Sequence, residues 1–337
     1  MSQTEYFSIK LENHNLIFLD QTKLPLEEVY VETDNYLRIA EAIERLEMRG
    51  APLIGIAAAY ALALSLKNVK TEIEKEFNKA FQKLASTRPT AVNLFTALND
   101  LKDEFQKLAE KESAYEVLLG KAIEIHKKDE EYCLRMGRNG LSLFKEKSNV
   151  LTHCNTGKLA TGGIGTAFGI IKTAFDNGLV NHVFADETRP LLQGLRLTSF
   201  ELDRSGIPFT LQTDSSAAEL MKQGKVDLVI TGADRIALNG DSANKIGTYS
   251  LAILANYHKI PFYIAAPSTT IDKSIATGKE IVIEYRSEKE LFAINKIDIT
   301  LNNYKAFTPA FDVTPAHLIS GIVTEEGVFS FPYNFIQ

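Results

Sequence analysis

Short apolar segments alternate with amphipathic segments through the second half of the chain. The apolar segments predict β-strands at residues 150–153, 182–185, 208–212, 228–231 and 262–266. Apolar residues recur at helical spacing between them, which predicts helices at residues 159–177, 192–205, 217–223 and 245–258. Strands that alternate with helices are typical of a parallel, doubly wound sheet. The carboxyl ends of all five strands then lie along one edge of that sheet.

The first part of the chain has a different pattern, in which helical spacing dominates. It predicts helices at residues 33–48, 51–66, 71–84, 91–108 and 114–128, after an opening segment that supplies a few strands. The sequence therefore predicts an α/β protein with two domains. A small, mostly helical N-terminal domain covers residues 1–125, the domain with the parallel sheet covers residues 126–337, and a helix around residues 113–146 links them.

Composition and charge exclude several classes of partner. The chain has 337 residues and a net charge of −6, without a long basic block, so we expect neither nucleic acid nor a membrane as partner. The longest apolar run, residues 51–66, is shorter than the roughly 18 residues that indicate a membrane span and predicts a buried helix. Cys133 and Cys154 cannot form a disulfide framework, and no signal-peptide pattern opens the chain, so we expect a cytoplasmic protein.

Cys154 directly follows the predicted strand at residues 150–153, at the edge where open α/β sheets bind ligands. A helix that begins at residue 159 offers N–H groups that bind phosphate and favour a thiolate. The alternative is a buried structural thiol. His153 and Cys154 are adjacent, and the chain has no CxxC or HxH pair, so the sequence predicts no metal site.

Gly163, Gly165 and Gly169 form a GxGxxxG pattern, and Asp186 lies at a later strand end. A dinucleotide fingerprint places its first glycine at the end of the strand, whereas Gly163 lies about ten residues farther on. The spacing argues against nicotinamide binding, and we predict no cofactor. We interpret the glycines as positions that let a helix pack closely on the sheet.

Polar residues also stand at another strand end and at three predicted helix starts. Asp234 follows the strand at residues 228–231, where a carboxylic acid beside apolar walls can act as a general acid or can simply cap a helix. Lys245 opens a predicted helix and either holds a phosphate or is a surface charge. Arg49 and Arg88 each precede a helix, where an arginine beside free N–H groups can bind phosphate.

In combination these segments resemble the methylthioribose-1-phosphate isomerase family. The matching motifs are RGAPLIGIAAAYALAL at 49–64, RPTAVNL at 88–94, LTHCNTGKLATGGIGTA at 151–167, DETRPLLQGLRLT at 186–198, TGADRIALNGDSANKIGTYSLAILA at 231–255 and PAFDVTPAHLISGIVTEEGV at 309–328. Members convert a 5-substituted ribose 1-phosphate into the matching ribulose 1-phosphate in methionine or 5-deoxyribose salvage. The resemblance implies a small phosphorylated sugar as substrate, a Rossmann-like C-terminal domain and a homodimer.

The resemblance also implies roles for individual residues. Cys154 matches the catalytic cysteine of the family and Asp234 its general acid. The matching substrate-binding positions are Arg49, Gly50, Ala51, Arg88, Gln193, Asn244 and Lys245. Lys158, Leu53 and Ser215–Ser216 depart from the family pattern, which leaves open whether the 5-substituent is methylthio or deoxy.

Two routes can move the hydrogen from C2 to C1 of such a substrate once Asp234 has protonated the ring oxygen. Cys154 acts either as the base of a proton transfer or as the group that stabilises a hydride shift. Two related functions remain as alternatives: isomerisation of ribose 1,5-bisphosphate, and the partner-binding role of the regulatory subunits of a translation-initiation exchange factor. A dehydrogenase is a more distant alternative.

Overall fold

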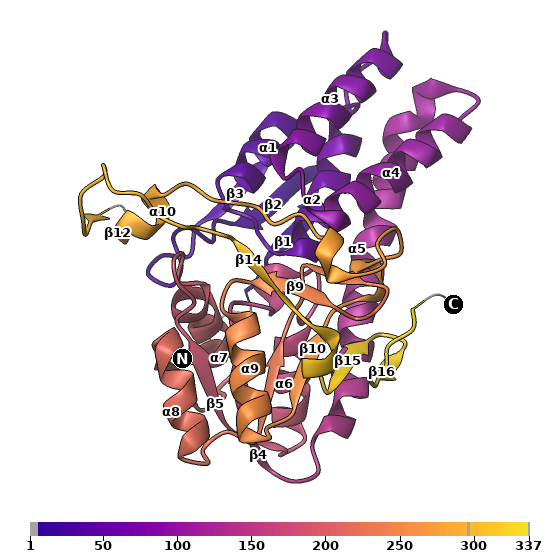
Figure 1. The fold of residues 1–337 in the computed structure, drawn as a ribbon. Helices are drawn as coiled ribbons and strands as arrows, with labels where there is room; N and C mark the ends of the chain where they lie inside the picture. Colours follow the sequence, from indigo (N-terminus) through magenta and orange to yellow (C-terminus); the bar gives the residue numbers. More distant parts are fainter. Residues whose placement is uncertain (1–5, 295–296, 336–337) are drawn as a thin grey trace. The chain divides into compact units, whose positions relative to one another are not determined.

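The computed structural model describes residues 6–294 and 297–335, which form two compact units (Figure 1). Unit 1 consists of Met1–Leu134 and Gly157–Gly165, and unit 2 consists of Arg135–Thr156 and Thr166–Gln337. The chain therefore passes between the units within helix α5 (Ala114–Asn139) and again at both ends of the segment 157–165. The predicted domain boundary near residue 125 stays a prediction.

Unit 1 combines an antiparallel sheet of order β1-β2-β3 with a group of helices. The strands are β1 (Ile9–Glu12), β2 (Asn15–Leu19) and β3 (Tyr30–Thr33). The other helices are α1 (Tyr36–Glu44), α2 (Ala51–Leu64), α3 (Ile73–Thr87) and α4 (Val92–Lys107). All five predicted helices of this part of the chain are therefore present, and α5 continues beyond its predicted end.

Helix α2 forms the centre of the core of unit 1. Of its 14 residues, 13 are buried, which confirms the prediction of a buried, alanine-rich helix. Gly55 allows α4 to approach, since an ideal Cβ at this position lies 2.7 Å from the carbonyl oxygen of Asn93. Among the described residues, the structure contains no helix with the length and apolar character that crossing a membrane requires.

The main sheet of unit 2 has seven strands in the order β16-β15-β10-β7-β4-β5-β6. Its strands are β4 (Ser148–Thr152), β5 (Val180–Asp186), β6 (Phe209–Gln212), β7 (Leu228–Thr231), β10 (Phe262–Ala265), β15 (Gly321–Thr324) and β16 (Gly327–Phe329). All neighbours pair in parallel except β15 and β16. The five predicted strands and their parallel arrangement are confirmed.

Helices cover both faces of this sheet. They are α6 (Ala167–Asp176), α7 (Ser199–Arg204), α8 (Ala217–Lys222) and α9 (Thr248–His258). Consecutive strand residues belong to different hydrophobic cores: Val150 packs with residues of α6 and α7, whereas Leu151 packs with residues of α8 and α9. Because successive side chains of a strand point to opposite faces, buried parallel strands must be apolar at nearly every position.

A second, four-stranded sheet follows the loop after β7. Its order is β11-β8-β9-β14, and its strands are β8 (Arg235–Ala237), β9 (Ser242–Lys245), β11 (Ile271–Asp272) and β14 (Phe311–Thr314). A short helix α10 (Lys289–Phe292) and the hairpin strands β12 (Ala293–Ile294) and β13 (Ile297–Asp298) lie between β11 and β14. The predicted helix start at Lys245 is wrong, because α9 begins only after Gly247, whose φ is +105°.

The predicted helix start at residue 159 is also wrong. Helix α6 begins at Ala167, and residues 157–165 form a loop of unit 1 that contains a single turn of 3-10 helix, Lys158–Ala160. The loop is closed at its ends by a hydrogen bond from the Thr166 N–H to the Thr156 carbonyl, at 2.8 Å. An ideal Cβ on Gly163 lies 2.9 Å from both Glu130 Cα and Cys133 Cβ. This glycine therefore packs against α5, and its interpretation as a contact between a helix and the sheet is wrong.

We expect Gly194→Ala to destabilise the protein strongly. An ideal Cβ on Gly194 lies 1.7 Å from the carbonyl oxygen of Asp186, so the end of β5 must shift to admit it. Overpacking of this kind costs about 1–3 kcal/mol, which urea denaturation measures.

The control for this prediction is Gly120→Ala in α5, where, apart from the adjacent residues and the backbone of α5 itself, no described atom lies within 4 Å of the added carbon. The higher helix propensity of alanine should raise the free energy of unfolding by up to about 1 kcal/mol. Equal stabilities of the two variants would contradict the prediction.

Candidate active site

Cys154 follows β4 and adopts a backbone conformation that is rare for residues other than glycine. Its φ is +61°, in the left-handed region, and its side chain is half-buried. The backbone N–H of Cys154 donates a hydrogen bond to Thr188 Oγ1 at 2.8 Å. The hydroxyl of Thr198 donates to the Cys154 carbonyl at 2.5 Å. These two hydrogen bonds offset the free energy that the left-handed conformation costs.

His153, the residue before Cys154, is buried, and both of its ring nitrogens have partners. Its Nδ1 lies 2.9 Å from Asp186 Oδ2 and its Nε2 lies 2.9 Å from the carbonyl oxygen of Ile246. Both nitrogens face oxygen atoms, an arrangement that favours the doubly protonated imidazolium. Burial disfavours the charged ring, but the hydrogen bond to Asp186 and its negative charge outweigh burial and raise the pKa of His153.

His153, Asp186 and Asp214 bring three potential metal ligands within 4.8 Å of one another. Protein donors already occupy the carboxylates: Gln212 donates to Asp186 Oδ1 at 2.7 Å. Asp214 accepts from two backbone N–H groups, including that of Thr188 at 2.8 Å. We interpret the group as a hydrogen-bonded brace beneath the strand ends, and the absence of a metal site stays a prediction.

Asp234 lies between β7 and β8 and is half-buried. Its N–H donates to the carbonyl of Ala243 at 2.8 Å. Since β8 and β9 pair Arg235 with Ala243, the register places Asp234 opposite Asn244. Asn244 pairs in turn with Asp312 of β14. Side chains opposite one another in a sheet share a face, so Asp234, Asn244 and Asp312 form a polar row across the second sheet.

The residues around this row are held by buried hydrogen bonds. Asn244 is buried and donates to Thr248 Oγ1 at 2.9 Å. Asp312 accepts the N–H of Gly247 at 2.8 Å, while burial raises the pKa of the Asp312 carboxyl. Lys245 ends β9, and its Nζ lies 4.6 Å from the ring centroid of Phe311. A cation–π contact of this kind holds the lysine side chain along the sheet.

Gln193 directly precedes a turn of π-helix, Gly194–Thr198. Such turns inside helices occur frequently at functional sites. The Gln193 side chain is buried, and its Oε1 accepts no hydrogen bond from any described residue. A buried acceptor without a donor is the kind of group that a ligand can satisfy.

Four predicted site residues lie in unit 1. Arg49 is buried, and Gly50 and Ala51 begin α2. Gly50 has φ +101°, and an ideal Cβ there lies 2.6 Å from Ala160 Cα, so only glycine fits. The N-terminus of α2 has no side-chain cap, which leaves N–H groups available to an anion. Arg88 follows the end of α3 and is half-buried.

The other five predicted residues belong to unit 2, where neighbouring strands bring their loops together. They are Cys154, Gln193, Asp234, Asn244 and Lys245. β4 and β7 pair in parallel, and an ideal Cβ on Gly232 lies 2.8 Å from Thr156 Cγ2, so the loops after these strands are in contact. His153 connects the Cys154 loop to the carbonyl of Ile246.

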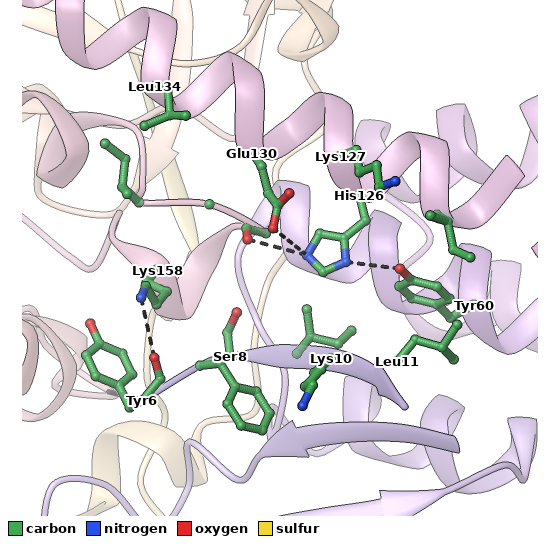
Figure 2. A pocket seen from close by; sticks show the side chains of 16 residues that line it. Tyr6, Ser8, Lys10, Leu11, Tyr60, His126, Lys127, Glu130, Leu134 and Lys158 are labelled. Carbon is green, nitrogen blue, oxygen red and sulfur yellow. Dashed lines mark hydrogen bonds and ion pairs between the residues drawn. The ribbon is translucent and has the colours of Figure 1, made fainter. Parts of the chain in front are cut away.

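Unit 1 contains a separate cavity of about 730 Å³ beside β1 and α5 (Figure 2). At its centre, His126 Nδ1 lies 3.0 Å from the Tyr60 hydroxyl, and His126 Nε2 lies 3.4 Å from the carbonyl oxygen of Gly162. Burial lowers the pKa of His126. Lys158 Nζ donates to the Tyr6 carbonyl at 3.4 Å. None of the nine predicted site residues is among the described residues that line this cavity, so we do not assign the reaction to it.

Sequence reasoning missed Thr188 and Thr198, the two residues that bind the backbone of Cys154. Both are buried, and Thr188 itself has φ +64°. Hydrophobic periodicity and composition carry no sign of a positive φ at a threonine, because β-branched residues rarely adopt one. Only the three-dimensional structure identifies these two residues.

The sequence matches the Initiation factor 2 subunit family over residues 47–331. It is also 51% identical over 331 residues to the methylthioribose-1-phosphate isomerase of Caldicellulosiruptor saccharolyticus, and the alignment covers 96% of each chain.

Two solved structures share the fold over nearly the whole chain. The crystal structure of 5-methylthioribose 1-phosphate isomerase from Pyrococcus horikoshii has a TM-score of 0.91 and 39% identity, and covers 98% of this chain and 94% of that one. The structure of translation initiation factor eIF-2B, subunit delta, from A. fulgidus has a TM-score of 0.84 and 41% identity, with coverage of 98% and 97%. The chain therefore has the mixed α/β fold of both proteins.

We expect His153 to stabilise the folded protein most at low pH. Because its pKa is raised on folding, this stabilisation is complete below pH 6.5, the ordinary value, and is lost as the pH rises through the raised pKa. In Asp186→Asn, burial becomes the main influence on the ring and lowers its pKa, so this variant should lose stability as the pH falls below 6.5.

Chemical denaturation at several pH values, together with NMR titration of the His153 ring, measures both effects. A His153 pKa that Asp186→Asn leaves unchanged would show that the carboxylate does not control the charge of the ring.

Proposed function

The chain belongs to the Initiation factor 2 subunit family, and we propose that it is an aldose–ketose isomerase that acts on 5-methylthioribose 1-phosphate. The product is the corresponding ribulose 1-phosphate, in methionine or 5-deoxyribose salvage. The observation that carries the proposal is 51% identity to a methylthioribose-1-phosphate isomerase over 96% of both chains. The proposal includes a small N-terminal domain, a Rossmann-like catalytic domain, a homodimer and a cytoplasmic location.

Asp234 is the proposed general acid, and its setting supports this role. The residue is half-buried in the short loop after the fully buried strand β7, and the register places it opposite Asn244. A carboxylic acid in partly apolar surroundings keeps its proton more readily, and the negative phosphate of the substrate adds to this effect. In the proposed reaction Asp234 supplies this proton to the sugar.

The phosphate on C1 of the substrate prevents the ring from opening to a free aldehyde. Asp234 donates its proton to the ring oxygen as the bond between this oxygen and C1 breaks. A hydride then moves from C2 to C1, and the C2 hydroxyl loses its proton as its oxygen becomes the ketone oxygen. One proton enters and one leaves, so the Asp234 carboxylate can recover its proton and the reaction needs no external oxidant or reductant.

We propose that Cys154 acts beside these carbons as a neutral thiol. A helix that began at residue 159 would favour a thiolate, but α6 begins only at Ala167. Within its first turn, the N–H of Phe168 already donates to Thr156 Oγ1 at 3.0 Å. The His153 ring, when protonated, is paired with Asp186. The negative substrate phosphate further disfavours a thiolate, which supports the hydride shift over proton transfer to a cysteine base.

The remaining predicted site residues are proposed to bind the substrate. They are Arg49, Gly50, Ala51, Arg88, Gln193, Asn244 and Lys245. The uncapped N-terminus of α2 supports a phosphate contact near Gly50, and the unsatisfied Oε1 of Gln193 supports a contact with a sugar hydroxyl.

The 41% identity to translation initiation factor eIF-2B, subunit delta, favours a second candidate function, regulation through binding of partner proteins. A scaffold has no physical need for a strand-end cysteine and a half-buried aspartate in these positions.

For isomerisation of ribose 1,5-bisphosphate, Lys158 gives no support, since it binds the Tyr6 carbonyl in unit 1. Comparing kcat/KM on 5-methylthioribose 1-phosphate, 5-deoxyribose 1-phosphate and ribose 1,5-bisphosphate separates these functions, and no turnover on any of them would favour the regulatory one.

We expect Cys154→Ala and Asp234→Asn each to lower kcat by at least about 100-fold, the smaller loss expected when a positioned acid–base group is removed. Steady-state kinetics with 5-methylthioribose 1-phosphate measures the effect. The control is Cys133→Ala, which removes the other thiol, fully buried in α5, and should leave kcat unchanged. Turnover near the normal rate in Cys154→Ala or Asp234→Asn would overturn the corresponding role.

We also expect that turnover in deuterium oxide leaves C1 of the product free of solvent deuterium. In a hydride shift the migrating hydrogen never exchanges with water, whereas a cysteine base exchanges its proton. NMR or mass spectrometry of the product measures the label. Substantial deuterium at C1 would rule out a pure hydride shift and restore Cys154 as the base.

A further inference from the structure

We propose that Thr188 and Thr198 are positioning residues, which hold Cys154 in the left-handed conformation that aims its thiol at the substrate. The inference rests on the proposed function, because it takes Cys154 as the residue that acts on the sugar. Neither threonine is proposed to touch the substrate.

The two threonines bind opposite sides of the same residue. Thr188 Oγ1 accepts the Cys154 N–H at 2.8 Å, and the Thr198 hydroxyl donates to the Cys154 carbonyl at 2.5 Å. Both peptide groups that flank the Cys154 Cα are thereby fixed. A cysteine in the left-handed region persists only where its surroundings impose that conformation, and these two hydrogen bonds impose it.

Thr188 is itself fixed in the orientation that this role requires. Its N–H donates to Asp214 Oδ1 at 2.8 Å, and its hydroxyl donates to the Asp186 carbonyl at 3.1 Å. A hydroxyl carries one proton, so toward Cys154 the Thr188 oxygen can only accept. The residue is fully buried, which excludes water as a competing donor.

Thr198 reaches Cys154 from the last residue of the π-helix Gly194–Thr198. Its hydroxyl proton is used in the bond to the Cys154 carbonyl, and its side chain is buried. The lack of a side chain at Gly194 lets this helical turn lie against the end of β5, since an ideal Cβ there meets the Asp186 carbonyl oxygen. The irregular turn therefore delivers the hydroxyl to the cysteine loop.

The conformation matters for chemistry because φ and ψ of Cys154 set the direction of its Cα–Cβ bond. Loss of one of these hydrogen bonds lets Cys154 relax toward extended conformations. The thiol then no longer has a fixed direction. Rates of reactions between bound groups fall steeply with small losses of alignment. The free energy that a left-handed conformation costs corresponds to about tenfold in rate.

The test compares Thr→Val with Thr→Ser at both positions. Valine keeps the shape of threonine but lacks the hydroxyl, whereas serine keeps the hydroxyl but lacks the methyl group. We expect Thr188→Val and Thr198→Val each to lower kcat about tenfold with KM within about twofold, and both serine variants to retain kcat. If the threonines only fill space, the serine variants lose activity and the valine variants retain it, which would overturn the proposal.

Thr152→Val is the matched control. Thr152 is buried two residues before Cys154, and its hydroxyl donates to the Ile230 carbonyl at 2.8 Å, without contact to the cysteine backbone in the described hydrogen bonds. This variant should lose some stability but keep kcat. A tenfold loss of kcat in Thr152→Val would show that any buried hydroxyl in this region matters equally and would overturn the proposal.

A second measurement needs no substrate. Alkylation of the folded protein by iodoacetamide is followed by mass spectrometry, with Cys133 as internal reference, since burial raises the pKa of the Cys133 thiol and keeps it unreactive. We expect Cys154 to react several-fold faster in the valine variants, because release exposes its half-buried thiol. Rates equal to the wild type would overturn the positioning role.

If the wild type turns over no substrate, the proposed function fails, and alkylation still decides whether the threonines hold Cys154. If Thr188→Val does not fold, Thr198→Val carries both measurements.

Discussion

The buried hydrogen bond between the ring of His153 and the carboxylate of Asp186 holds the strand-end loops of unit 2 together. The pair joins the ends of the neighbouring strands β4 and β5, Gln212 at the end of β6 donates to the same carboxylate, and the other ring nitrogen binds the carbonyl of Ile246 before α9. Removing one partner of a buried ion pair costs about 3–5 kcal/mol, because the remaining charge stays buried without compensation. The loops at this edge of the sheet therefore cannot relax independently. Because Cys154 follows His153 directly, the same hydrogen bonds restrict its backbone.

The sequence predicts the main sheet well because its strands are buried on both faces. Prediction from the sequence fails where strands lack this burial pattern. Strands such as β4 and β7 are buried on both faces and must be apolar at nearly every position, so they stand out from their surroundings. Strand β9 (Ser242–Lys245) lacks a run of apolar residues, and its sequence continues into the helical spacing of α9. The left-handed backbone at Gly247 separates the two elements, and nothing in the periodicity predicts that separation. The sequence therefore predicts a helix start at Lys245, although this residue ends a strand.

Helical spacing in the sequence also does not predict the loop at residues 157–165, for a related reason. Its glycines and apolar residues continue the pattern of α6, but this segment packs with unit 1, where Gly163 contacts Glu130 and Cys133 of α5. Helical spacing records only local order, whereas these contacts join positions about thirty residues apart. The candidate site shows the same division. The motifs predict candidate site residues such as Cys154, but they do not predict the positive φ of Cys154 and Thr188 or the hydrogen bonds that maintain it.

Fold alone does not separate an isomerase from a regulatory subunit, since this chain resembles both a solved isomerase and a solved initiation-factor subunit over nearly its whole length. The local backbone is more informative than the fold. A surface that only binds partners gains nothing from holding a cysteine in a conformation that costs free energy, at a strand end, with two buried threonine hydroxyls committed to its peptide groups. Conformational strain persists where the surrounding structure imposes it, and it concentrates at sites where orientation determines a rate. The strained backbone at Cys154 is therefore an argument for catalysis that is independent of sequence similarity.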